Sequence, residues 1–291
     1  MRFLPHPDTV KLLRIPFSLF LMPVFLLTLS QAPVHPLPAL FTFLIVHLLV
    51  YPASNGYNSY VDRDTESVGG IEKPPLPTRE LFRVTLFMDV LALVTSFLLN
   101  PLFSFCIACY IAASRLYSAP GIRLKRYPLT AFLIVSVFQG GFTYYMCYLG
   151  IAGSPPSLNQ ANMYILLACS LQIAGAYPLT QIYQHRQDLA GGIVSLSARL
   201  GYRGTFIFSA AMFILCGLFY YLYFITLHKP SHFQFVQLFF IPLLAYFLWW
   251  LVKTWNDSAH ASYSNTMRMN LIASVCMSAC FILLTFLKHA I

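Results

Sequence analysis

Three side chains with oxygen atoms recur at intervals of four residues after the second apolar segment. Asn58, Asp62 and Glu66 have the spacing i, i+4, i+8, which on a helix places them along one face. Two carboxylates one turn apart repel each other mildly, and Mg²⁺ is usually bound by one or two carboxylates with water and substrate phosphates. The spacing therefore predicts a Mg²⁺ site. A solvated helix end is the weaker alternative in a chain with only 9 acidic residues.

Basic side chains gather after the fourth apolar segment, where Arg115 is followed by Arg123, Lys125 and Arg126. Arginine binds phosphate oxygens in a bidentate manner and lysine acts as a point charge, so this loop could bind a polyphosphate. The alternative is that membrane topology alone concentrates basic residues there. The sequence leaves both interpretations open.

Amides and one carboxylate follow the sixth apolar segment. Gln184 and Asp188 are again four residues apart, and Gln181 lies about one helical turn earlier. This group is typical of a polar site at the edge of a membrane, although amides also form hydrogen bonds between membrane helices. Asp89 stands apart, near the middle of the third apolar segment, without an evident partner. A functional role and a packing role are equally favoured for it, so it stays outside the candidate site.

The composition indicates that these groups belong to a membrane protein. Hydrophobic residues make up 58% of the 291-residue chain and charged residues 9%, whereas a soluble domain is about 25% charged. So few charges could not cover a surface facing water, which excludes a soluble enzyme, a disordered chain and a nucleic-acid binder in solution. The net charge of +9 then indicates attraction to anionic lipid headgroups or to a small anionic ligand.

Long uncharged stretches predict nine membrane-spanning helices of about 20 residues each. Two are expected between residues 14 and 62 and two between residues 126 and 186, each pair separated by a turn. Single helices are expected near 80–99, 101–117, 203–226, 236–254 and 269–288. The 7 cysteines fall within the predicted helices, which leaves no disulfide framework.

The basic residues predict the orientation of these helices. All of the 18 Lys and Arg residues except Lys229 and Lys288 lie at the N-terminus, beginning with Arg2, or in the loops after the second, fourth, sixth and eighth helices. Cytoplasmic loops carry an excess of Lys and Arg. We therefore expect an integral multi-pass membrane protein with its N-terminus in the cytoplasm and its C-terminus on the opposite side. In a bacterium this would be the plasma (inner) membrane.

Taken in order, these motifs resemble those of the UbiA superfamily of intramembrane prenyltransferases. That family has nine helices, an N-x-x-x-D-x-x-x-D motif after helix two, a Y-S-P-P-like segment with basic residues after helix four, and a D-x-x-x-D motif after helix six. The corresponding residues here are Asn58, Asp62, Asp64 and Glu66 followed by Lys73-Pro74, then Tyr117-Ser-Ala-Pro120 with Lys125-Arg126, and finally Gln184 and Asp188. The segment 192–201 (GIVSLSARLG) resembles the G-x-x-T-L-x-x-R-L-G stretch that follows the last motif. The resemblance covers roughly residues 10–290.

The resemblance implies one all-α domain over residues 1–291, with about nine transmembrane helices around a central cavity. It implies Mg²⁺ as the cofactor, with Asp62, Glu66 and Asp188 as candidate catalytic and metal-binding carboxylates, Asn58 as a further metal ligand and Gln184 as an additional one. The residues implied in binding the diphosphate are Asn58, Lys73, Tyr117, Arg123, Lys125, Arg126 and Gln184. Glu66 and Gln184 each stand where the family motifs have Asp.

The implied function is transfer of an isoprenoid group from a prenyl diphosphate to a lipophilic acceptor, with an aromatic acceptor favoured, at the cytoplasmic membrane face. The expected partners are the prenyl diphosphate, the acceptor and the lipid bilayer, and no nucleic acid. A terpene cyclase of the same superfamily, which quenches the carbocation internally, is the first alternative. The missing acids of the second motif motivate another, a catalytically silent membrane binding or scaffold protein.

Overall fold

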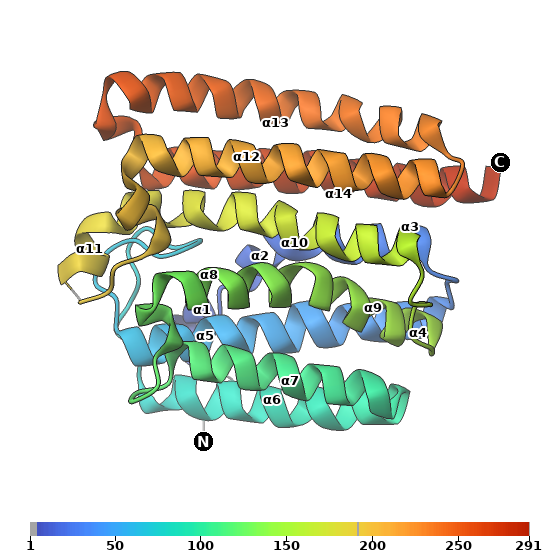
Figure 1. Ribbon diagram of the computed structural model, residues 1–291. Coiled ribbons are helices and arrows are strands. Elements are labelled where there is room, and N and C mark those ends of the chain that lie inside the picture. The colour runs from blue at the N-terminus through green and yellow to red at the C-terminus, as the bar shows by residue number, and fades with distance from the viewer. Residues whose placement is uncertain (1–4, 191, 291) are drawn as a thin grey trace. The chain divides into compact units, whose positions relative to one another are not determined.

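The chain folds almost entirely into helices (Figure 1). The computed structural model describes residues 5–190 and 192–290; Arg2 and the side chains of Arg186 and residues 288–290, including Lys288, lie outside the described part. In that part all regular structure is helical, apart from one β-bridge between Val68 and Ile71. The prediction of an all-α protein is confirmed.

Eight helical runs in the described part of the chain are long and apolar enough to cross a membrane. They extend over Pro7–Gln31, Pro36–Asp62, Arg79–Leu99, Pro128–Ala152, Gln160–Gln184, Leu196–Thr226, Pro230–Asn256 and Tyr263–Leu287. The additional helix α7 (Pro101–Ser118) corresponds to the expected helix at 101–117 and carries Arg115 in its last turn. The expected count of nine is therefore close, and the chain is an integral membrane protein.

Two compact units make up the fold, and each combines segments that are distant in sequence. Unit 1 is built from the described residues up to Leu19, from Pro33–Lys125 and from Met146–Ser154; unit 2 is built from Phe20–Ala32, Arg126–Tyr145 and the described residues from Pro155 onward. The helices of unit 1 are α1 (Pro7–Leu12), α2 (Ile15–Ser18), α4 (Pro36–Phe43), η2 (Leu44–Val50), α5 (Tyr51–Asp62), α6 (Arg79–Leu99) and α7. Unit 2 contains α3 (Met22–Gln31), α8 (Pro128–Ser136), η4 (Val137–Gly141), α10 (Gln160–Gln181), η5 (Ile182–Gln184), α11 (His185–Ala190), α12 (Leu196–Thr226), α13 (Pro230–Asn256), η6 (Ser258–His260) and α14 (Tyr263–Ala290). Three elements carry the chain from one unit into the other: η1 (Leu19–Leu21), η3 (Leu124–Arg126) and α9 (Phe142–Ala152).

Close packing in unit 1 depends on Gly56 of α5. A Cβ atom at this position would lie 2.8 Å from Thr85, 2.9 Å from Leu13 and 3.2 Å from Leu81. Glycine therefore lets α5 approach α6 and the N-terminal segment closely, as small residues do between membrane helices. The core around this contact comprises Leu12, Leu13, Ala53, Val68, Ile71, Leu81 and Met88.

Helix ends in unit 1 are fixed by local backbone chemistry. Arg63 adopts a left-handed conformation with φ 53° and closes α5 at Asp62. Asn100 begins α7, because its Oδ1 accepts hydrogen bonds from the amides of Leu102 (2.8 Å) and Phe103 (3.0 Å). The chain runs through α6 in the direction opposite to α5 and α7. The C-terminal ends of α5 and α7 therefore lie at the same end of the unit.

Unit 2 packs α10 against α12 through Gly175, whose missing side chain makes room for the ring of Phe213, 2.6 Å from an ideal Cβ. The hydroxyl of Tyr220 on α12 donates to Gln172 Oε1 on α10 at 2.9 Å. One turn further along α12, the hydroxyl of Tyr223 donates to Gln31 Oε1 of α3 at 2.7 Å. Buried phenols and half-buried amides thus satisfy one another within the apolar bundle, as hydrogen-bonding groups in a membrane must.

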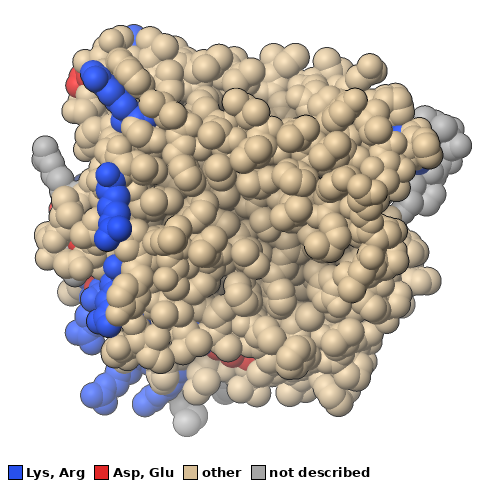
Figure 2. Space-filling view, in the orientation of Figure 1, with Lys and Arg blue, Asp and Glu red and all other residues tan. Residues whose placement is uncertain are grey.

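Large apolar side chains cover the outward side of α6. Phe87, Phe97 and Leu98 are 65%, 60% and 81% exposed, respectively, and most of the face drawn in Figure 2 is uncharged. Such a surface is stable against lipid tails and not against water. The side of the membrane that each end of the helices faces stays a prediction.

Candidate functional site

The polar end of unit 1 centres on Asp62, the last residue of α5. Its side chain is 9% exposed, and Nζ of Lys125, itself 9% exposed, donates to its Oδ2. Arg123 lies 3.6 Å from the other carboxylate oxygen, Oδ1. A buried carboxylate therefore lies beside two basic side chains from the loop that follows α7.

A tight turn brings this loop back onto α5. Gly121 and Arg123 have positive φ angles of 91° and 44°, and the amide of Arg123 donates to the carbonyl of Ala119 at 2.9 Å. The short helix η3 follows at once and carries Lys125. The loop thereby directs two cations at the end of α5.

Polar side chains also join α5 to α7 along a line that we call the polar seam. The hydroxyls of Ser54 and Ser114 lie 2.6 Å apart, and Asn58 Nδ2 donates to Ser118 Oγ at 2.7 Å. Residues 54, 58 and 62 share one face of α5. The predicted face containing Asn58 and Asp62 is therefore present, and it turns toward α7 and its loop.

The predicted helical face does not extend to Glu66. Because Arg63 is left-handed, α5 ends at Asp62, and Glu66 is exposed in the loop beyond it. The expectation that Asn58, Asp62 and Glu66 share one helix is wrong for its last member. Lys73 is also exposed, at a bend in the same loop.

Arg14 anchors the loop that carries Asp64 and Glu66, a role that the sequence analysis did not anticipate. Its side chain is 8% exposed, and it donates to the carbonyl oxygens of Gly69 at 3.3 Å and Asn55 at 3.0 Å. The only sequence signal was an arginine at the start of the first long uncharged stretch. Its contacts fix the loop against α5.

Asp64 lies half-buried in this cationic environment. Burial raises the pKa of its carboxyl, and the neighbouring charge of Asp62 raises it further. The positive charges of Lys125, Arg14 and Arg123 act in the opposite direction on this pKa without cancelling the increase. Asp64 is therefore less easily ionised than an exposed aspartate.

In unit 2, the second predicted motif lies where α10 ends. Gln181 is the last residue of α10, Gln184 closes η5, and Asp188 lies in the short helix α11. Gln184 and Asp188 are half-buried. Gln181 Oε1 is buried and accepts no hydrogen bond from the described residues.

His185 fixes the start of α11. Its Nε2 lies 2.8 Å from Ser197 Oγ, and its ring stacks on Tyr202 with the ring centres 4.9 Å apart. Burial lowers the pKa of the imidazole, which favours a neutral ring. His185 was not expected in the site; it orients the segment that carries Asp188.

The remaining predicted residues are less closely grouped. Tyr117 is half-buried in the last turn of α7, next to Ser118. Arg126 belongs to unit 2, is exposed, and donates from Nη2 to the hydroxyl of Tyr127 at 2.7 Å. Of the predicted residues, the structure brings Asn58, Asp62, Arg123 and Lys125 together in unit 1.

The donor atoms fit a cation that arrives with phosphate oxygens. Within residues 5–190 and 192–290, no three His, Cys, Asp or Glu side chains form a group that could bind a metal ion. Asp62 Oδ1 is nevertheless buried without a hydrogen-bond partner in the described structure. Mg²⁺ needs only one or two carboxylates when substrate phosphates complete its coordination. Asp62 can serve as such a carboxylate.

The chain also matches a known protein family by sequence. The model of the UbiA prenyltransferase family matches residues 19–285. The chain belongs to this family. No curated protein matches it in sequence.

Solved structures of UbiA homologs share the fold. A UbiA homolog from Archaeoglobus fulgidus bound to DMAPP and Mg²⁺ is similar with a TM-score of 0.72 and 16% identity, over 96% of this chain and 99% of that chain. A UbiA homolog from Archaeoglobus fulgidus bound to GPP and Mg²⁺ has a TM-score of 0.71 and 18% identity, over 98% and 100% of the two chains. The apo UbiA homolog from Aeropyrum pernix K1 has a TM-score of 0.69 and 18% identity, over 92% and 98%. The expected UbiA fold is confirmed.

Asp89 of this UbiA chain has a partner that its sequence did not reveal. Arg115 donates to it from Nε at 2.9 Å and from Nη2. The expectation that Arg115 belongs to the phosphate-binding loop is wrong, since it lies within α7 and its guanidinium points to α6. The expectation that Asp89 has no evident partner is therefore wrong, because it pairs with Arg115.

Replacing Asp64 with asparagine in the UbiA chain is expected to leave its thermal stability unchanged or higher at neutral pH. A carboxyl whose pKa is raised on folding destabilises the folded state at pH values above that raised pKa, where it is ionised. At pH values below its unfolded-state pKa of about 3.9 it is protonated in both states, and the destabilisation is absent. The advantage of the variant should therefore shrink as the pH falls through this range. Melting temperatures in detergent across pH measure it, and a lower melting temperature than wild type at neutral pH would contradict the assignment.

Proposed function

We propose that this chain transfers an isoprenoid group from a prenyl diphosphate to a lipophilic acceptor, aromatic in the favoured case, in a Mg²⁺-dependent reaction at the cytoplasmic membrane face. The observation that carries the proposal is the buried carboxylate of Asp62 beside Lys125 and Arg123, with one oxygen left without a hydrogen bond. Membership of the UbiA prenyltransferase family supports it. So do the similar folds of homologs bound to DMAPP or GPP with Mg²⁺.

The reaction breaks an allylic carbon–oxygen bond and needs stabilisation of the departing diphosphate rather than a protein nucleophile. Bound Mg²⁺ would supply Lewis-acid stabilisation of that leaving group. Lys125 and Arg123 donate to the diphosphate oxygens, and Asp62 offers its carboxylate to the cation. Asn58, oriented by Ser118, presents its amide at the same end of α5.

The other family motif residues complete this assignment. Asp188 supplies the carboxylate of the second motif, and Gln184 supplies an amide oxygen, which coordinates without adding negative charge. Glu66 is proposed as a further metal-binding carboxylate that is carried by the loop rather than by α5. Lys73, Tyr117 and Arg126 are proposed as additional diphosphate donors.

The test uses the purified full-length chain in detergent or nanodiscs with radiolabelled prenyl diphosphates from dimethylallyl to geranylgeranyl. We expect diphosphate release that requires Mg²⁺, is abolished by EDTA and yields a prenylated lipid when an acceptor is supplied. A hydrocarbon or terpene alcohol formed without acceptor would favour the cyclase instead. The absence of release and of thermal stabilisation by Mg²⁺ with every diphosphate would overturn the proposal and favour a silent scaffold.

We further propose that the loops holding Glu66 and Lys125 face the cytoplasm, with the N-terminus on the same side. Single cysteines in place of the exposed residues Glu66 and Lys229 should react with a membrane-impermeant maleimide from opposite sides of the membrane. In intact cells only the Lys229→Cys variant should be labelled, and in inverted vesicles only Glu66→Cys. Labelling of Glu66→Cys in intact cells would reverse the orientation.

A further inference from the structure

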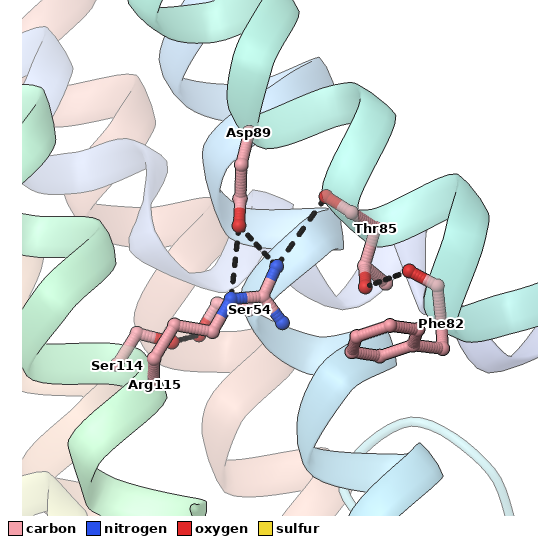
Figure 3. Close-up of polar contacts among 6 residues, drawn as sticks. All are labelled: Ser54, Phe82, Thr85, Asp89, Ser114 and Arg115. Atoms are coloured by element: carbon pink, nitrogen blue, oxygen red, sulfur yellow. Dashed lines mark hydrogen bonds and ion pairs between the residues drawn. The ribbon is translucent and has the colours of Figure 1, made fainter.

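An ion pair lies within the membrane-spanning part of unit 1, outside the site described above. Asp89 is in the middle of α6 and Arg115 is in the last turns of α7, with side chains 10% and 19% exposed. Figure 3 shows both guanidinium nitrogens Nε and Nη2 directed at one carboxylate oxygen, Oδ2. An ionisable pair at this depth calls for an explanation beyond packing.

The guanidinium of Arg115 contacts two neighbouring helices at once. Besides Asp89, its Nη2 donates to the carbonyl of Thr85 on α6 at 3.3 Å. Its Cζ lies 4.1 Å from the centre of the Tyr57 ring on α5, a cation–π distance. Arg115 therefore ties its own helix, α7, to both α5 and α6.

Stability alone does not explain this arrangement. Replacing a buried ion pair by apolar side chains of similar volume is often neutral or stabilising, because both charges lose their solvation on burial. A buried polar pair can instead specify one register between helices that would otherwise pack in several ways. The outward side of α6 is formed by exposed apolar side chains such as Phe87, Phe97 and Leu98, which specify no register against α7.

The register set at Arg115 coincides with the register of the polar seam. Tyr57, under the guanidinium, directly precedes Asn58. Arg115 directly follows Ser114, whose hydroxyl contacts that of Ser54 in the same view (Figure 3). Ser118, one turn further along α7, accepts a hydrogen bond from Asn58. A slip of α7 by one turn would move it by about 5.4 Å and would separate both seam contacts. It would also displace the loop that carries Lys125.

We infer that Asp89 and Arg115 are positioning residues for the diphosphate site: they fix the register of α7 against α5 and α6, and thereby the places of Asn58 and Lys125. The inference rests on the proposed function for its consequence in binding. The part of the inference that concerns the register of α7 does not depend on the proposed function. Neither residue touches the substrate.

The register is measured without any ligand in a Ser54→Cys/Ser114→Cys background. Hydroxyl oxygens 2.6 Å apart place the two side chains near the separation that a disulfide requires. Oxidation should join them in the parent chain, as identified by peptide mass spectrometry. Adding Asp89→Leu/Arg115→Leu should lower the yield at least threefold while the melting temperature stays near that of the parent.

Ligand binding is measured separately on the same substitutions without the added cysteines. We expect the dissociation constant of a non-ionising geranyl diphosphate analogue with Mg²⁺, and the KM for geranyl diphosphate, to rise about tenfold to a hundredfold, as for other residues that orient a ligand-binding group. The kcat should change less. Ser104→Ala is the matched control, because it removes a hydrogen bond from α7 to the Leu93 carbonyl of α6, 3.0 Å long, far from the seam. It should leave cross-linking and binding unchanged.

Arg115→Lys covers the case in which the double leucine variant does not fold. It retains the charge opposite Asp89 but loses the planar fork and the stacking on Tyr57, so cross-linking and affinity should both fall. Unchanged cross-linking and unchanged affinity in a folded variant, with or without a lower melting temperature, would overturn the inference. If the parent chain binds no prenyl diphosphate, the proposed function fails, and the cross-linking yield still decides the register.

Discussion

Replacing Asp62 with asparagine is expected to slow diphosphate release about a hundredfold or more, the range seen when a group that stabilises transition-state charge is removed. The substitution removes the negative charge that would neutralise the cation. It also leaves Lys125 buried without its partner, and breaking a buried ion pair costs about 3–5 kcal/mol. Release rates at saturating substrate and melting temperatures measure the two effects.

Two further variants separate the loss of charge from the loss of stability. Asp64→Asn removes an acid two residues away that does not share the helical face of Asn58, so its effect on release should be much smaller. Asp62→Asn/Lys125→Met removes both buried partners and should recover melting temperature but not release. Equal loss of release in Asp62→Asn and Asp64→Asn would show that the helical face is not the basis of the site.

The helices were predictable because the membrane limits the choices of the chain. Lipid offers no hydrogen bonds, so a spanning segment must be helical and of a set length. A long apolar stretch therefore shows its own boundaries: the helix expected at 80–99 is Arg79–Leu99, and the expected helix at 101–117 is Pro101–Ser118. The spacing of Asn58 and Asp62 was informative for the same reason, since α5 contains both.

The details of the site were not predictable where they depend on a single backbone angle or on a distant contact. The spacing of Glu66 was helical, but the left-handed Arg63 ends the helix first. This conformation is usually adopted by glycine or asparagine, so an arginine gave no sign of it. Asp89 lies 26 residues from Arg115, so nothing local identified the pair. Arg14 contacts Gly69 across 55 positions for a comparable reason. Such pairings follow from helix packing, which a single sequence does not specify.

Replacing Lys125 with methionine is expected to change cation binding in opposite directions with and without diphosphate. In the structure, Lys125 Nζ donates to Asp62 Oδ2, so a cation that binds alone to both carboxylate oxygens must displace this ammonium group. Removal of the ammonium should therefore tighten binding of Mn²⁺ alone, measured by electron paramagnetic resonance. A hydrogen bond to a charged group is worth about 1.5–3 kcal/mol, which corresponds to roughly a tenfold to hundredfold change.

With diphosphate present, the same ammonium group can transfer its hydrogen bonds from Asp62 to phosphate oxygens. Lys125→Met then lacks a donor to the leaving group, so binding of Mn²⁺ with geranyl diphosphate should weaken and release should slow by a comparable factor. Arg123, 3.6 Å from Asp62 Oδ1, remains to keep the carboxylate paired and the chain folded. Arg83→Met is the matched control, because it removes an exposed cation of α6 and should change neither constant. Weaker Mn²⁺ binding in Lys125→Met under both conditions would mean that Lys125 organises Asp62 for the metal rather than competing with it.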